Sequence, residues 1–202
     1  MVFRSSKLSF AKLTLLGASA LALSSCALLQ GPEAPRETYE LTAVDDVAGL
    51  TGATRAQILV KVPSALKSID SDRIVVRPTP SVVTYLAGAQ WSDTLPRMVQ
   101  AKLVTAFENT AATGATAQPG DGLVIDYQLI GQIRRFGIDE TARQARLEMS
   151  VKLLSDRSGK VVETRVFTAT APAGSGADYV AALDRAFDAL TRDIVRWVIG
   201  RT

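Results

Sequence analysis

The stretch of sequence that decides the fold runs from residue 142 to residue 154 and reads ARQARLEMSVKLL. From residue 145 onward, apolar and polar side chains alternate. The apolar set is Ala145, Leu147, Met149, Val151 and Leu153, and the polar set is Arg146, Glu148, Ser150 and Lys152. Because successive side chains of a strand point to opposite faces, this pattern predicts a sheet with one face in a core and one face in water.

The sequence on either side extends this strand into a meander. Residues 123–136 read LVIDYQLIGQIRRF and predict a strand in which Gly131 is a candidate β-bulge. Downstream, a turn over Asp156–Lys160 precedes a third predicted strand over Val161–Ala171. Short connections of this kind favour antiparallel neighbours. We therefore expect three consecutive antiparallel strands.

The first half of the chain predicts further strands. Gln57–Val62 has the composition of a buried strand and is followed by Pro63. Arg73–Arg77 is a second strand, and Ser81–Leu86 alternates well enough to be its hairpin partner. A short extended segment, Tyr39-Glu40-Leu41, is expected to open the domain.

Two amphipathic helices complete the pattern. In the first, Ser92 or Asp93 can act as the N-cap and Pro96 falls in the first turn. The second covers Ala177–Ile199, with apolar residues at steps of three and four. The order of strands, helix, strands and helix predicts an α+β fold. We expect a single domain with a mixed or antiparallel sheet and two helices packed on one face.

The N-terminal residues carry a targeting pattern. Residues 1–25 combine a basic start, an apolar stretch of about eleven residues and small residues before a cysteine, which is typical of a secretory signal peptide. The run Leu23-Ser24-Ser25-Cys26 resembles a bacterial lipobox. We therefore expect cleavage before Cys26 and lipid on its thiol. Residues 26–38, with Gly31 and two prolines, are expected to be a flexible tether to a domain over residues 39–202.

Charge and composition exclude several classes of function. The net charge of +3 comes from Arg4, Lys7 and Lys12 in the signal segment, so the remainder is formally neutral. A neutral domain has no net field to attract nucleic acid. The chain has no histidine and one cysteine, which excludes catalytic triads with histidine and any intramolecular disulfide. We expect no enzyme activity, no metal site and no cofactor other than the covalent lipid on Cys26.

A few local groupings remain as candidate sites. Paired acids at Asp45-Asp46, Asp70 with Asp72, and Asp139-Glu140 are interpreted as solvated turns. Arg134-Arg135 with Phe136 would suit an anionic ligand, but a solvated strand end is the favoured interpretation.

Two aromatic residues are the candidate partner-binding residues. Tyr85 and Trp91 lie close together in the sequence, just ahead of the first helix. Large aromatic side chains are common anchors of protein interfaces. The alternative for Trp91 is a core role in which it fastens the entry of the helix.

The same residues carry a resemblance to a known family. A tyrosine-bearing strand that leads into Gln90-Trp91-Ser92-Asp93-Thr94-Leu95-Pro96, together with the lipobox at Cys26 and the strand Ile58-Leu59-Val60-Lys61-Val62-Pro63, resembles the ABC-type transport auxiliary lipoproteins. That group includes paraquat-inducible protein C. The resemblance covers nearly all of the chain after Cys26 and includes no catalytic signature.

The resemblance implies a role in lipid transport. Members accompany mammalian-cell-entry (MCE) domain proteins of the periplasm, an inner-membrane permease and an ATPase. The expected place is the periplasmic face of the outer membrane, where the chain would dock the MCE protein and could form a homo-oligomeric ring. Two alternatives stay open: a lipoprotein that assembles or pilots another outer-membrane complex, and a lipid-anchored periplasmic enzyme.

Overall fold

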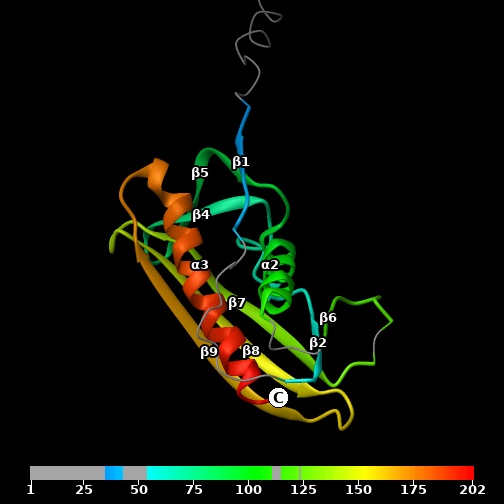
Figure 1. Cartoon of the computed structure of the whole chain (residues 1–202). Helices are drawn as coiled ribbons and strands as arrows, with labels where there is room; N and C mark the ends of the chain where they lie inside the picture. Colours follow the sequence, from blue (N-terminus) through cyan, green and yellow to red (C-terminus); the bar gives the residue numbers. More distant parts are fainter. Residues whose placement is uncertain (1–34, 43–53, 111–114, 123) are drawn as a thin grey trace, which may run out of the picture. The chain divides into compact units, whose positions relative to one another are not determined.

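The computed structural model describes residues 35–42, 54–110, 115–122 and 124–202 (Figure 1). The predicted signal peptide and the lipobox with Cys26 lie outside the described residues, as does the acid pair Asp45-Asp46. The described residues form one domain of the α+β class, in which a mixed sheet carries two helices. The predicted fold class is confirmed.

The predicted meander is present. Strands β7 (Tyr127–Asp139), β8 (Gln144–Ser155) and β9 (Val161–Pro172) pair antiparallel in that order. The bulge, however, is not at Gly131: the register of β7 against β8 shifts between Ile133 and Arg135. Gly131 has a packing role instead, because a Cβ at this position would collide with the side chain of Met149.

Shorter strands line the other edge of β7 and make the sheet mixed. Three segments run parallel to β7 along this edge: β2 (Gln57–Val60), β3 (Ser64–Ala65) and β4 (Arg73–Thr79). Beyond β4 the sheet continues through β5 (Val82–Trp91) to β1 (Glu37–Tyr39). Beyond β2 it ends in β6 (Ala115–Ala117), which runs parallel to β2. β5 is antiparallel to β4, as the predicted hairpin requires, and β1 is parallel to β5.

The first helix, α2 (Leu95–Asn109), begins later than the predicted caps would place it. Its N-cap is Thr94, and no side chain caps it. The reason is that the preceding residues still belong to the sheet region: the Trp91 amide donates to the Asp72 carbonyl at 2.7 Å, and the Ser92 amide donates to the Tyr39 carbonyl at 2.9 Å. The prediction that Ser92 or Asp93 is the N-cap was therefore wrong. The prediction that Pro96 lies in the first turn of the helix is confirmed.

The two helices cover one face of the sheet. Figure 1 shows α2 and α3 (Gly176–Ile199) side by side in front of the strands, and the two helices contact each other. Phe187 of α3 lies 6.1 Å from Phe136 of β7, and Trp197 lies 5.5 Å from Phe167 of β9, measured between ring centroids. Every apolar residue of the alternating set in β8 is buried beneath this layer.

The first described residues are fastened to the second helix. The backbone N–H and the hydroxyl of Thr42 both donate to the carboxylate of Asp184, at 2.7 and 2.6 Å. Leu41 beside it is fully buried. β1 begins at Glu37, two residues before the predicted start of the domain at Tyr39. Within the described ranges, no helix has the length and apolar character needed to cross a bilayer.

Candidate docking surface

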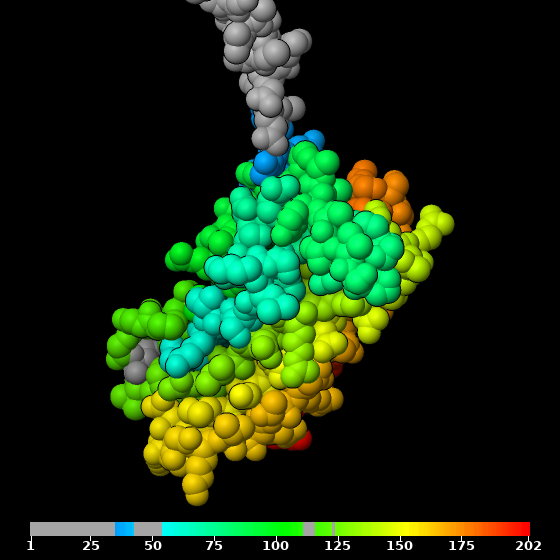
Figure 2. All heavy atoms as spheres, turned by 180° about the vertical axis from the view of Figure 1, so that it is seen from behind, coloured from blue at the N-terminus to red at the C-terminus, as the bar shows by residue number. Residues whose placement is uncertain are grey.

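The helices leave the opposite face of the sheet uncovered, and we name it the outer face. Figure 2 views the domain from behind, where the strands dominate the surface and α3 appears only at the margin. The outer face carries the polar set of β8, of which Arg146 and Lys152 are exposed and Glu148 is half-buried. Polar strand residues on a rigid sheet can form a recognition surface without any moving part.

Tyr85 lies on the outer face, at its edge. It stands opposite Val75 in the β4–β5 pair and is 37% exposed. The guanidinium of Arg73 lies 4.8 Å from the centroid of its ring, which is a cation–π distance. A half-exposed tyrosine held in place by an arginine is suited to a protein interface, and Tyr85 remains a predicted partner-binding residue.

Trp91 has a different position. Its side chain is 2% exposed, and its ring meets Phe136 edge to face with 6.3 Å between centroids. The indole therefore offers no surface to a partner, which corrects the interpretation of Trp91 as an exposed anchor. The alternative, a core residue at the entry of the helix, describes its position. Trp91 is buried because the last residue of β5 pairs with Tyr39 of β1 and lies beneath the helical layer.

Arg134 and Arg135, predicted to end a strand, are both ion-paired. Arg134 lies 3.5 Å from Glu148, and Arg135 lies 3.7 Å from Asp139. The interpretation as a strand end was wrong, because β7 continues past both residues to Asp139. The ion pairs lie along the strand, with Arg134 exposed and Arg135 half-buried. Asp139 also accepts a hydrogen bond from the Ala142 amide at 3.1 Å, so this acid closes the turn between β7 and β8.

The other acids also serve the structure. Asp70 pairs with Lys67 at 3.4 Å. An unusually low pKa marks two carboxyl groups: Glu163, chiefly through its hydrogen bond from Arg201, and Asp178, chiefly through the backbone N–H of Gly174. A general acid needs the opposite shift. Among the described residues, no three His, Cys, Asp or Glu side chains gather into a metal site.

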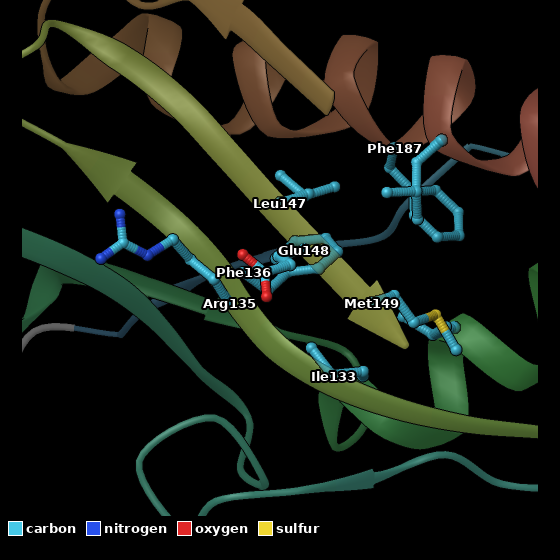
Figure 3. A pocket seen from close by; sticks show the side chains of 9 residues that line it. Ile133, Arg135, Phe136, Leu147, Glu148, Met149 and Phe187 are labelled. Carbon is cyan, nitrogen blue, oxygen red and sulfur yellow. The ribbon is translucent and has the colours of Figure 1, made fainter. Parts of the chain in front are cut away.

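The interior offers little room for a ligand. A gap between the sheet and the helices is lined mainly by apolar side chains, among them Ile133, Phe136, Leu147 and Phe187 (Figure 3). It has space for about one water molecule. Two shallow hollows lie on the outer face around Ser64 and Gln132, and Lys152 borders one of them.

Known proteins share this arrangement. The crystal structure of protein XCC0632 from Xanthomonas campestris superposes with a TM-score of 0.75 at 32% identity, covering 82% of this chain and 96% of that chain. The hypothetical protein CT253 from Chlamydia trachomatis has the same fold at 9% identity, with a TM-score of 0.51 over 73% of this chain and 98% of that chain.

Sequence comparison gives the family. An uncharacterized protein of Bradyrhizobium diazoefficiens is 29% identical over 84% of this chain, which spans 46% of that protein's length. The family model described as the ABC-type transport auxiliary lipoprotein component matches residues 39–195, and this range includes β5, Trp91, α2 and most of α3. The chain belongs to the family of ABC-type transport auxiliary lipoprotein components.

Proposed function

We propose that this protein is a non-catalytic accessory of an ABC-type system that moves lipid across the periplasm. Its partners would be an MCE-domain periplasmic protein and the inner-membrane permease and ATPase behind it. The single observation that carries the proposal is the family match over residues 39–195, which names an auxiliary component of ABC-type transport.

The lipid on Cys26 would fix the protein to the periplasmic face of the outer membrane. A lipobox cysteine carrying several acyl chains gives far more stable anchoring than one chain would. Residues between Cys26 and β1 would set the reach of the domain. Attachment to the membrane then raises the effective concentration of the docking surface near its partner.

The outer face would be the docking surface. The outer face is built from strands whose opposite face is buried in the core, so the backbone that carries the outer side chains is held in place. It mixes arginine, lysine and carboxylate side chains with Tyr85 at one edge. Such a mixture provides specificity and orientation in protein recognition. A homo-oligomeric ring would place several such faces around the MCE-domain partner.

A purely structural role also accords with the chemistry. The chain has no histidine to act near neutral pH, and the shifted carboxyl groups Glu163 and Asp178 are stabilised in their ionised form. Transport energy would come from the ATPase partner, since this sequence contains no phosphate-binding loop.

Affinity purification tests the proposal. A C-terminally tagged chain is solubilised from membranes in mild detergent and its companions are identified by mass spectrometry. We expect the MCE-domain protein, with the permease and the ATPase in lower amounts. The matched control is the Cys26→Ala variant, which should be absent from the outer-membrane fraction. Recovery of a secretin or another assembly machine in place of transport components would contradict the proposal.

A further inference from the structure

Three arginines of β4 and β8 lie on the outer face, on either side of β7. In the β4–β7 pair Arg77 stands beside Asp139, and in the β7–β8 pair Gly137 stands opposite Arg146. Arg73 lies on the same face of β4 as Arg77, because four residues separate them. Figure 2 shows the side of the domain on which these strands meet.

These three arginines lack the ionic partners that their neighbours have. Arg134 and Arg135 are paired with Glu148 and Asp139. Arg73, Arg77 and Arg146 form no ion pair with any carboxylate in the part of the chain that the structure describes. We name these three residues the arginine surface.

Two of them also hold hydrogen-bond donors without an acceptor. The Nε atoms of Arg73 and Arg77 are buried and donate to no acceptor among the described residues. A buried N–H without an acceptor costs about 1–3 kcal/mol. Since Arg73 already packs on Tyr85, its guanidinium is held in place rather than free to turn into water. Because the Nε atoms are buried, an incoming acceptor would have to bind the other N–H groups of these guanidinium groups.

Val75 and the Gly137 backbone pack closely between the arginines. Gly137 has no side chain, and a Cβ there would lie only 2.7 Å from the Val75 carbonyl oxygen. β4 and β7 therefore meet closely, with Val75 packed against the Gly137 backbone. Between Arg77 and Arg146 the outer face is therefore formed by the Gly137 backbone and the short apolar side chain of Val75.

The spacing indicates what would bind. Arg73 and Arg77 are four residues apart on one strand, which is about 13 Å. In an extended peptide, side chains four residues apart have the same spacing and the same direction. The planar fork of arginine pairs in a bidentate way with carboxylates. Asp139 and Glu148 lie among the arginines, so the surface alternates in sign, which suits a polypeptide of defined sequence better than a uniformly anionic membrane.

We infer that the arginine surface binds an extended acidic segment of a protein partner, with carboxylates four residues apart facing Arg73 and Arg77. The inference rests on the proposed function, because it names the chemistry of the partner that docks on the outer face. Arg146 receives a further carboxylate from the same segment, and Tyr85 packs against its edge.

The test uses the full lipidated chain in phosphatidylcholine nanodiscs. The probe is a fluorescein-labelled ten-residue peptide with glutamates four residues apart in a serine–threonine background, and its glutamine counterpart is the control ligand. Fluorescence anisotropy measures the dissociation constant. We expect binding of the glutamate peptide alone, and an increase of about tenfold or more in its dissociation constant for Arg77→Gln/Arg146→Gln.

Matched variants separate this surface from general charge. Arg97→Gln/Arg157→Gln removes two charges from side chains outside the outer face that are strongly exposed, and should change the dissociation constant by less than about twofold. Arg77→Lys keeps the charge but loses the fork, so we expect only partial affinity. Circular dichroism melting checks that each variant is folded.

Three results would overturn the inference. The first is an equal loss of peptide affinity in the two double variants, and the second is equal binding of the glutamate and glutamine peptides. The third is an absence of peptide binding together with hydrogen exchange in β4 that slows only when phosphatidylglycerol is added to the nanodiscs. The last result would mean that the surface faces lipid. Because no transport partner is present, the outcome is separable from the proposed function: peptide binding can succeed where affinity purification fails, and the reverse.

Discussion

Replacing Trp91 with alanine should remove one of the largest contributions to the stability of the domain. The side chain is 2% exposed. An aromatic side chain of about 200 Å² buried at about 25 cal/mol per Å² contributes about 5 kcal/mol. The edge-to-face contact with Phe136 adds about 1 kcal/mol, and partial collapse of the cavity offsets some of the loss. We expect the free energy of unfolding to fall by about 3–5 kcal/mol.

Urea unfolding followed by far-ultraviolet circular dichroism measures this loss. The matched control is Leu66→Ala, because Leu66 is an apolar residue that is 70% exposed, and its removal should cost less than about 0.5 kcal/mol. If Trp91→Ala lost less than about 1 kcal/mol and instead abolished recovery of the transport partners, Trp91 would be an interface anchor and the assignment to the core would be wrong.

Three further predictions concern the backbone contact, the N-terminal attachment and the dependence on pH. Gly137→Ala should destabilise the domain by about 1–3 kcal/mol, since the new Cβ meets the Val75 carbonyl oxygen at 2.7 Å. Gly176→Ala is the matched control: its Cβ meets only the end of Leu86 at 4.0 Å, so its unfolding in the same urea titration should be unchanged. Asp184→Ala removes the carboxylate that accepts hydrogen bonds from the amide and the hydroxyl of Thr42. The Thr42 amide should therefore exchange with deuterium at least tenfold faster, while the amides of β8 keep their rates. Unchanged exchange at Thr42 would refute the attachment of this residue to α3. The pKa of Glu163 is lowered in the folded state, first by the hydrogen bond from Arg201. The ionised carboxylate therefore stabilises the fold above its ordinary pKa of 4.5, and this stabilisation is lost as the pH falls through the lowered pKa. Melting temperatures measured from pH 7 to pH 3 should fall less steeply for Glu163→Gln than for the unaltered protein, and parallel curves would contradict this.

Elements with a strong local pattern were predictable from the sequence. The alternation in β8 predicted which face of the strand is buried. Side chains of a strand alternate between two faces, so the face that carries the apolar residues must be the one in the core. The helical spacing of Leu183, Phe187 and Leu190 likewise gave the buried side of α3.

Features that depend on distant pairing were not predictable. β3 and β6 have two and three residues and exist only because β7 and β2 supply their hydrogen-bonding partners. The parallel arrangement of β2 and β4 beside β7 leaves no local mark in the sequence. The cap at Thr94 depends on Ser92 being held by Tyr39, a residue far away in the chain. The burial of Trp91 follows from the same long-range pairing.

The arginine surface was missed for the same reason. Arg134-Arg135 was visible as a dipeptide, yet both residues have carboxylate partners in the fold. Arg73, Arg77 and Arg146 are isolated in the sequence, and only the registers of β4 and β8 against β7 bring them to one face. The signal that could have indicated the arginine surface is the presence of arginines at the solvent-facing positions of several strands.

Site-specific photo-crosslinking in intact cells tests the central claim, that the outer face docks a component of an ABC-type transport system. A photoreactive residue replaces Thr170, which stands opposite Arg146 and is exposed, or Ala189, which is exposed on α3. We predict that the probe at position 170 captures the MCE-domain protein and that the probe at position 189 does not. Capture of that protein from position 189 alone, or of a different envelope machine from position 170, would contradict the account.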